Sequence, residues 1–276
     1  MSVSTWVPRA LSIAGSDSGG GAGIQADLKT FTALGVYGMT AITAVTVQNT
    51  QGVSDYQELS PTIVADQIRS VAGDIGVDAA KTGMLASAAI VVAVTDAIRD
   101  CVLPNLVVDP VFVSKHGHSL LDADAVAALR DQLLPLARIV TPNLHEAAGL
   151  VESPPIEDRD GMRAAAEKIM GFGPGAVLMK GGHLEGPVAA DLLFDGDEEL
   201  WLESPRIDTP NTHGTGCVLS AAIAAQLARG SGLGVAVAGG KEFVTKAIER
   251  SLTIGQGIGP VNPVWESLGG AEDRDA

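Results

Sequence analysis

The feature that most constrains the fold is the repeated alternation of short apolar runs with amphipathic helical patterns. Runs rich in β-branched residues predict strands, and apolar side chains at helical spacing predict helices. Repeated strand–helix units are typical of an α/β protein with a mostly parallel sheet and helices on both faces. We therefore expect a single domain over residues 1–276, with the first ~8 residues and the tail after residue 260 frayed.

The pattern places each element at a definite point in the chain. We expect strands at residues 10–14, 39–47, 78–81, 106–108, 137–140 and 176–179. Helices are expected at residues 22–34, 61–72, 87–100, 122–134, 158–171, 215–229 and 234–254. Residues 191–194 and 199–203 flank Asp195-Gly196, which predicts a hairpin that adds antiparallel strands at one edge. Ligands of such sheets bind at the carboxyl ends of the strands.

Composition and charge exclude several classes of protein. Apolar residues make up 46% of the chain and charged residues 18%, which argues against disorder. The net charge of -15 argues against binding nucleic acid through a broad basic face. With only Cys101 and Cys217, a disulfide framework and a structural zinc are not expected. We find no signal-peptide layout and no apolar run long enough to span a bilayer, so we expect a cytoplasmic protein.

A glycine turn that leads into a helix is the strongest candidate for a binding site. His213 is followed by Gly214, Thr215, Gly216 and Cys217, and then by an Ala-rich helical stretch. The first turn of a helix leaves backbone N–H groups without intrahelical acceptors, and the helix dipole favours an anion there. We expect this turn to hold a transferring phosphoryl group and the dipole to favour the Cys217 thiolate. A capped core helix with a small buried cysteine is the alternative.

Two polar segments in the N-terminal half also follow predicted strands. Residues 14–23 are rich in glycine but match neither the P-loop nor the dinucleotide fingerprint. Their glycines let the backbone approach a small flat ligand, and Asp27, one turn into the next helix, can face the same site. Gln48 offers one acceptor and two donors, which suit the edge of an aminopyrimidine. The alternatives are a flexible turn, a helix-start charge at Asp27 and a strand-end Gln48 that binds loop backbone.

Three further segments carry oxygen ligands or a cation. Asp109 ends a strand, and Asn143 and Glu146 lie three residues apart at the start of a helix. Such oxygens, often through water, suit Mg²⁺ bound to phosphates, although a plain helix cap is the alternative. Lys180, followed by two glycines, is placed to reach a phosphate, the alternative being a solvated loop lysine. Residues 115–118 (Lys-His-Gly-His) lack further ligands, so we interpret them as a mobile flap rather than a metal site.

Taken together, these motifs closely resemble the hydroxymethylpyrimidine/phosphomethylpyrimidine kinases of thiamine biosynthesis, over nearly the whole chain. The resemblance implies the ribokinase-like three-layer sandwich, with ATP and Mg²⁺ as cofactors. It implies phosphorylation of 4-amino-5-hydroxymethyl-2-methylpyrimidine to the monophosphate and then to the diphosphate, and it leaves a homodimer open. We expect no fused thiamine-phosphate synthase. The matching segments are residues 14–30, 48–50, 81–84, 109–111, 143–146, 180–183 and 212–217.

The resemblance also implies roles for individual residues. The pyrimidine would lie near Gly15, Ala22, Asp27, Gln48, Met84 and Val111. The nucleotide would lie near Lys180, Asn143, Glu146 and Asp191, and the ion and its waters near Asp109 and Glu146. The anion hole and the catalytic group would come from Gly214, Thr215, Gly216 and Cys217, with Lys180 on the phosphates.

Some residues depart from the family pattern, and other functions compete. Phe112 stands where Met is expected, and residues 115–118 differ from the usual Ser-Gly flap. In the wider ribokinase family an Asp that acts as base follows Gly-Thr-Gly, whereas this chain has Cys217. We infer that a carboxylate there would repel a phosphomonoester acceptor. A pyridoxal kinase of the same fold and a non-catalytic pyrimidine-binding sensor are the alternatives, whereas an NAD-dependent oxidoreductase lacks its glycine fingerprint.

Overall fold

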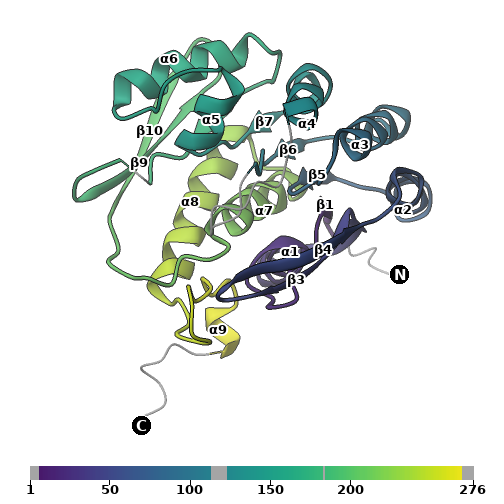
Figure 1. The fold of residues 1–276 in the computed structure, drawn as a ribbon, viewed down its shortest axis with the longest axis horizontal. Helices are drawn as coiled ribbons and strands as arrows, with labels where there is room; N and C mark the ends of the chain where they lie inside the picture. The colour runs from purple at the N-terminus through teal and green to yellow at the C-terminus, as the bar shows by residue number, and fades with distance from the viewer. Residues whose placement is uncertain (1–5, 113–122, 183, 269–276) are drawn as a thin grey trace.

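A computed structural model describes residues 6–112, 123–182 and 184–268 and has a central sheet between two helical layers (Figure 1). In the described residues the sheet has eight strands in the order β10-β9-β8-β7-β6-β5-β1-β2. All neighbours from β2 to β8 are parallel, whereas β9 and β10 form an antiparallel hairpin at one edge, as predicted. The strands are β1 (Arg9–Ala14), β2 (Tyr37–Ile42), β5 (Ala79–Thr82), β6 (Leu106–Val108), β7 (Ile139–Val140), β8 (Val177–Met179), β9 (Val188–Phe194) and β10 (Glu199–Pro205).

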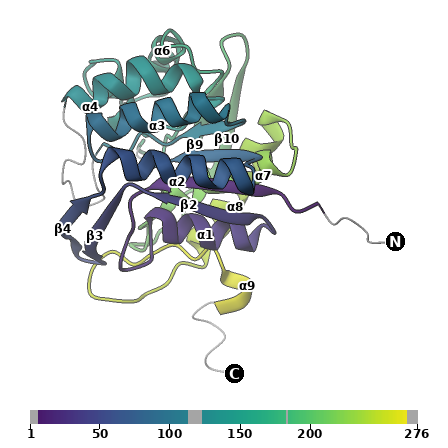
Figure 2. The same ribbon diagram turned by 90° about the vertical axis from the view of Figure 1, so that its right-hand side faces the viewer.

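Helices cover both faces of this sheet, which confirms the predicted α/β class. One layer contains α1 (Gly23–Ala33), α7 (Thr215–Ala228) and α8 (Leu233–Glu249). The other contains α2 (Pro61–Asp74), α3 (Ala88–Cys101), α4 (Ala123–Ala128), α5 (Leu144–Leu150) and α6 (Arg159–Met170). Figure 2 shows α2, α3 and α4 in a row along one side, and the short α9 (Trp265–Leu268) lies near the C-terminal end. Among the described residues, no helix combines the length and apolarity needed to cross a membrane.

The side chains of β1 show how one strand serves both layers. Leu11 and Ile13 pack into the apolar cluster under α2 and α3, whereas Ala10 packs into the cluster under α7. Successive side chains of a strand point to opposite faces of the sheet. A parallel strand that helices cover on both faces therefore carries apolar side chains on both faces. The near-continuous apolar runs of the sequence therefore form a central sheet with a core on each face.

Helix α7 is buried along most of its length, and this fixes the glycine turn at its start. Its alanines allow close approach to the sheet and to α8, and a Cβ at Gly240 of α8 would lie 2.7 Å from Ile223 Cγ1. Close packing of this kind leaves little room for the helix to shift. The turn from His213 to Cys217 is thus held at one position at the carboxyl end of the sheet.

The prediction of one continuous strand at residues 39–47 is wrong, because the structure divides this run between two sheets. The chain leaves the central sheet after Ile42, and β3 (Ala44–Asn49) pairs with β4 (Gly52–Glu58) in a separate antiparallel ribbon that the sequence did not predict. The Gln67 side chain in α2 accepts from the Ile42 N–H at 2.9 Å and donates to its carbonyl at 3.1 Å. These bonds satisfy the Ile42 backbone on the open side of β2, which is the edge strand, while the Thr43 N–H still donates to the Ala14 carbonyl of β1 at 3.1 Å. Beyond this point Val45 and Val47 are exposed.

The predicted helix at residues 122–134 is α4 continued by a wider turn at Leu129–Leu133 and a tighter one at Leu134–Leu136. Pro135 lacks a backbone N–H, which suits the end of a regular helix. The predicted flap at residues 115–118 lies outside the described residues.

Candidate active site

The carboxyl ends of the parallel strands open into one cavity of about 1080 Å³. Its walls come from the segments after β1, β5, β6, β7 and β8, together with β3 and the start of α7. A cavity of this size accommodates a small ring together with a nucleotide. The predicted site residues in its lining are Gly15, Ala22, Gln48, Met84, Asp109, Val111, Asn143, Glu146, Lys180, Asp191, Gly214, Thr215, Gly216 and Cys217.

The turn at the start of α7 has a backbone that only glycine adopts without strain. Gly214 caps the helix with φ of 82°, and a Cβ there would lie 1.9 Å from the carbonyl oxygen of Gly21. No side chain caps this helix. The N–H groups of Gly216 and Cys217 belong to the first turn and have no intrahelical acceptor, so they face the cavity as anion donors.

Lys180 joins two buried carboxylates beside this turn, and a Cβ at Gly216 would lie 3.3 Å from its Nζ. Its Nζ lies 2.8 Å from Asp109 Oδ1 and 3.7 Å from Glu146 Oε2. Asp109 also accepts from Thr141 Oγ1 and Ser220 Oγ, both at 3.2 Å. Burial would raise the pKa of Asp109, but Lys180 holds it below its ordinary value. Burial, together with the Asp109 charge, raises the pKa of Glu146 to about 7 although Lys180 opposes it.

Asn143 and Glu146 form a reciprocal helix cap and face the cavity as well. Asn143 Oδ1 accepts from the Glu146 N–H at 2.9 Å, and Glu146 Oε2 accepts from the Asn143 N–H at 2.7 Å. The helix-cap alternative from the sequence is therefore correct as a description of the local structure. It does not compete with a role in binding, because the same Glu146 oxygen lies near Lys180.

A family model described as phosphomethylpyrimidine kinase matches residues 17–262. The chain belongs to the phosphomethylpyrimidine kinase family. A Streptomyces coelicolor protein named hydroxymethylpyrimidine/phosphomethylpyrimidine kinase is 52% identical over 258 residues, which cover 94% of this chain and 95% of that protein.

Two solved structures are similar to this family member across most of the chain. An ADP complex of Bacillus subtilis pyridoxal kinase has a TM-score of 0.86 and 41% identity, covering 93% of this chain and 97% of that chain. A phosphomethylpyrimidine kinase from Clostridium difficile has a TM-score of 0.77 and 43% identity, covering 87% and 99%. The sandwich predicted from the sequence is the fold that these kinases share.

Asp27 lies under the cavity of this family member rather than in its lining. Its side chain is fully buried, and both of its oxygens lie 2.9 Å from Lys81 Nζ, with Ser12 Oγ at 2.6 Å. The expectation that Asp27 faces a ligand is not met here, because the side chain on α1 points into the sheet. Burial would lower the pKa of Lys81, but Asp27 and the other nearby negative groups raise it, so Lys81 stays charged. The sequence signal for Lys81 was a lone lysine inside an apolar strand.

Cys217 does not carry the thiolate that the helix dipole suggested. Burial raises the pKa of its thiol to about 11, even though Lys81 opposes the shift. The thiol is therefore neutral at pH 7 in the absence of ligand. The dipole effect of one helix end is smaller than the cost of placing an anion in this enclosed position.

Two cationic side chains in the cavity lining, Lys241 and Arg206, were not predicted as site residues from the sequence. Asp191 accepts from the Gly181 N–H at 2.9 Å and from Lys241 Nζ at 2.7 Å. The Arg206 guanidinium donates to the carbonyl oxygens of Gly182 and Gly186, at 2.6 and 2.8 Å. These bonds hold the segment that follows Lys180. Lys241 and Arg206 lie 61 and 26 residues beyond Lys180, so local spacing gave no signal for them.

Proposed function

We propose that this protein transfers the γ-phosphoryl group of ATP to the hydroxymethyl group of 4-amino-5-hydroxymethyl-2-methylpyrimidine, and then to the resulting monophosphate. The observation that carries the proposal is the single cavity in which an amide, an anion-binding turn and a lysine–carboxylate cluster meet. Membership of the phosphomethylpyrimidine kinase family and the name of the Streptomyces coelicolor relative support it.

The pyrimidine would occupy the end of the cavity between β3 and the segment after β5. Gln48 supplies donor and acceptor groups there, and Met84 and Val111 supply apolar surface. A Cβ at Gly15 would lie 3.3 Å from Met84 Sδ, so the glycine leaves space for a flat ring. An amide at the edge of an apolar slot fits the amino edge of a pyrimidine.

The phosphates would occupy the middle of the cavity. Phosphoryl transfer requires alignment and charge neutralisation more than covalent chemistry. The amides of the turn would hold the migrating group, and Lys180 would move from Asp109 to the ATP phosphates. Asn143 and Asp191 would lie on the nucleotide side, where the ADP complex of the Bacillus subtilis relative supports nucleotide binding.

Asp109 and Glu146 fit a magnesium ion that is bound mainly by phosphates and water. Among the described residues, no three His, Cys, Asp or Glu side chains converge to form a complete metal site. Mg²⁺ usually keeps several waters and takes one or two carboxylates from the protein, which matches this pair. When bound, the ion would neutralise charge on the phosphates. Lys180 holds the two carboxylates in place until the nucleotide arrives.

The experiment is mass analysis of the products formed from the pyrimidine alcohol, ATP and Mg²⁺. We expect two successive phosphoryl mass increments, and Lys180→Ala should abolish both. Glu242→Gln, which breaks an exposed ion pair of α8 with Lys246, is the matched control and should leave both steps intact. Absence of any phosphorylated pyrimidine would refute the proposal, and wild-type rates in Lys180→Ala would refute the phosphate role of Lys180.

Pyridoxal kinase activity is the second candidate, because the Bacillus subtilis pyridoxal kinase has a TM-score of 0.86 to this chain. A side-by-side assay with pyridoxal and the pyrimidine alcohol distinguishes the two, and we expect the higher kcat/KM with the pyrimidine. A non-catalytic sensor would show no ATP turnover on addition of pyrimidine, whereas we expect such turnover.

We also propose a homodimer in the cytosol. Val45 and Val47 expose 50% and 59% of their surface on one face of the β3–β4 ribbon, and pairing through that face would cover them. Light scattering would measure the mass in solution, and a monomer at all concentrations would contradict this assembly.

A further inference from the structure

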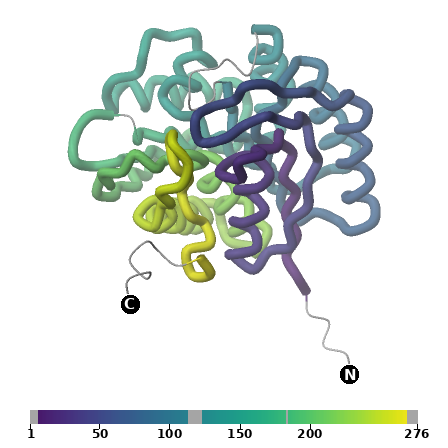
Figure 3. The backbone as a smooth tube through the Cα atoms, turned by 60° about the horizontal axis from the view of Figure 1, so that its bottom comes forward, coloured from purple at the N-terminus to yellow at the C-terminus, as the bar shows by residue number. Residues whose placement is uncertain are grey.

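A short segment near the C-terminal end connects two parts of the cavity wall. Residues 257–261 (Gly-Ile-Gly-Pro-Val), here called the spacer, bind the tip of the β3–β4 ribbon at one end and His213 at the other. Figure 3 shows the yellow C-terminal segment beside the purple N-terminal part of the chain. Gln48 lies two residues before the bound ribbon tip, and Gly214 directly follows His213. The spacer therefore joins the pyrimidine end of the cavity to the anion-binding turn.

The contact with the ribbon is made by Thr50 and leaves no room for a side chain. The Thr50 carbonyl accepts from the Ile258 N–H at 2.9 Å, and Thr50 Oγ1 accepts from the Gly257 N–H at 3.2 Å. A Cβ at Gly257 would lie 2.0 Å from that same carbonyl oxygen. Because non-bonded heavy atoms pack at about 3.5 Å, a side chain at position 257 must push the ribbon and the spacer apart by roughly 1 Å or more.

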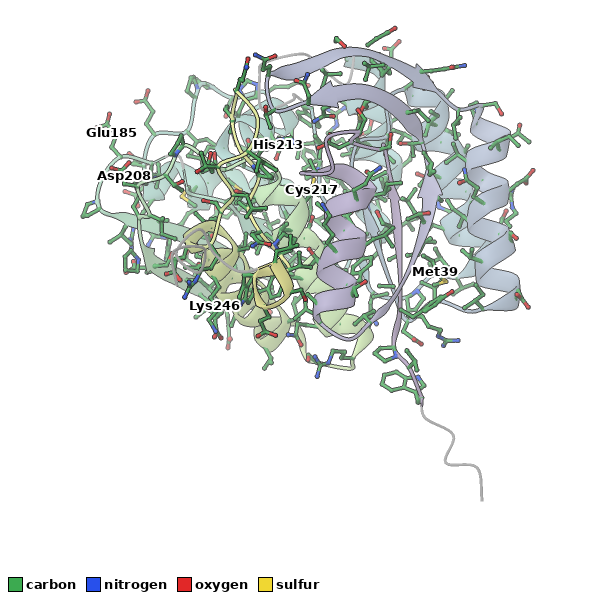
Figure 4. All side chains as sticks on the ribbon, turned by 90° about the horizontal axis from the view of Figure 1, so that it is seen from below. Met39, Glu185, Asp208, His213, Cys217 and Lys246 are labelled. Atoms are coloured by element: carbon green, nitrogen blue, oxygen red, sulfur yellow. The ribbon has the colours of Figure 1, made fainter. Side chains whose placement is uncertain are left out.

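The other end of the spacer is fixed to the anion-binding turn. The His213 N–H donates to the Gly259 carbonyl, and the His213 carbonyl accepts from the Val261 N–H, both at 3.0 Å. The His213 side chain is buried and its Nε2 lies 2.9 Å from Oδ2 of the buried Asp17. Figure 4 shows His213 beside Cys217, at the start of α7. Because α7 is buried along most of its length, this end of the spacer has a constant position.

The ribbon has a second attachment at Gln48 itself. Ser18 Oγ accepts from the Gln48 N–H at 2.8 Å and donates to the Gln48 carbonyl at 2.7 Å. Ser18 and the spacer thus hold the end of β3 at two points that lie two residues apart. Two points of attachment fix both the position and the tilt of the strand, and with them the place from which the Gln48 side chain enters the cavity.

We propose that the spacer sets the distance between Gln48 and the anion-binding turn, with Gly257 and Thr50 as positioning residues for phosphoryl transfer. Efficient transfer requires the reacting atoms to be aligned about 3–3.5 Å apart, and a misplacement of about 1 Å costs about 100-fold in rate. A ring bound to Gln48 moves with the ribbon, whereas the phosphoryl group stays with the turn. This inference rests on the proposed function, since it concerns the pyrimidine as acceptor.

Gly257→Ala tests the spacer directly. We expect kcat/KM for the pyrimidine alcohol to fall roughly 10- to 100-fold, because the ring shifts with the ribbon. The affinity for ATP, measured by calorimetry, and the slow transfer to water without pyrimidine should stay within about twofold of wild type, since neither uses the ribbon. Gly73→Ala in α2 is the matched control. Among the described residues a Cβ at Gly73 would meet no atom within 4 Å, so this variant should behave as wild type in all three measurements.

Thr50→Ala is a second variant that disturbs the backbone less. It removes the hydroxyl bond to Gly257 but keeps the carbonyl bond, so kcat/KM for the alcohol should fall about threefold to tenfold. Thr50→Ser keeps the hydroxyl and should retain wild-type kinetics. Ser18→Ala combined with Thr50→Ala should lose more than the product of the two single losses, because each attachment holds the strand when the other is absent. If Gly257→Ala and Thr50→Ala lower transfer to the pyrimidine, transfer to water and ATP affinity in equal proportion, the positioning role is refuted.

The same variants distinguish this inference from the proposed function. If wild type phosphorylates no pyrimidine, the proposed function fails, and hydrogen exchange without substrate then tests the spacer. Gly257→Ala and Thr50→Ala should speed the exchange of the β3–β4 amides at least about threefold, whereas Gly73→Ala should not. Unchanged exchange in the first two variants would overturn the inference. If wild type phosphorylates the pyrimidine and Gly257→Ala does so equally well, only the inference fails.

Discussion

Replacing Lys81 with Met should remove a large part of the stability of this protein. Lys81 and Asp27 are both fully buried, and the ammonium lies 2.9 Å from each carboxylate oxygen. Met fills a similar volume, but it leaves the carboxylate with only the Ser12 hydroxyl as a side-chain partner. Removing one partner of a buried pair costs about 3–5 kcal/mol. Since domains are stable by about 5–15 kcal/mol, this variant should be close to unfolding.

The double variant Lys81→Met with Asp27→Leu decides whether the cost comes from the unpaired charge. With both charges absent, we expect a stability within about 2 kcal/mol of wild type, because replacing a whole buried pair by apolar groups is often neutral. Glu242→Gln, in an exposed pair with Lys246, should change the free energy of unfolding by less than about 0.5 kcal/mol.

Urea denaturation at pH 8, followed by circular dichroism, measures these differences, provided that the slopes agree among variants. Burial raises the pKa of Asp27, and loss of Lys81 raises it further. The cost in Lys81→Met is therefore complete above that raised pKa and is relieved as the pH falls through it. A loss below 1 kcal/mol at pH 8, or a double variant as unstable as the single one, would refute this reasoning.

The pKa values of Glu146 and Cys217 predict how activity and thiol labelling respond to pH. A substitution at Cys217 predicts a difference between the two phosphorylation steps. Because the pKa of Glu146 is about 7, kcat/KM for ATP with Mg²⁺ should fall as the pH drops below 7, and the profile of Glu146→Gln should lack that limb. Because the pKa of Cys217 is about 11, against an ordinary value of 9.0, iodoacetamide should label it about 100-fold more slowly at pH 7 than a free thiol, in a Cys101→Ser background. Labelling as fast as free cysteine would contradict the neutral thiol. Cys217→Asp should slow phosphorylation of the monophosphate more than that of the alcohol, and separate assays showing equal losses would contradict the repulsion argument.

The periodicity of the sequence was sufficient to predict the layers and the edge hairpin. Apolar runs covered on both sides and helical spacing are local properties, so each strand–helix unit could be recognised by itself. The break after Ile42 could not be predicted, because it lies where the neighbouring β1 ends at Ala14 and where Gln67, 25 residues further along the chain, binds the Ile42 backbone. From sequence, residues 39–47 form one β-branched run, and only tertiary packing divides it between two sheets.

The convergence of the polar segments was predictable for a similar reason. Parallel strands bring their carboxyl ends to one edge, and residues that follow those strands meet there. The direction of Asp27 was not predictable, since a helical side chain faces either the ligand or the sheet according to the rotation of its helix. The Asp17–His213 pair spans 196 residues, and no local pattern links its two members.

The charges around Cys217 explain why a neutral group suits that position. Asp27 and Asp109 balance the charges of Lys81 and Lys180, and Glu146, with a pKa of about 7, adds about half a negative charge at pH 7. A phosphomonoester acceptor adds almost two further negative charges beside the phosphates of ATP. A carboxylate at position 217 would repel that acceptor by about 3 kcal/mol per charge at roughly 5 Å and an effective dielectric constant of about 20. The alcohol carries no charge and avoids this cost, so the thiol permits both reactions in one cavity, whereas a carboxylate favours only the first.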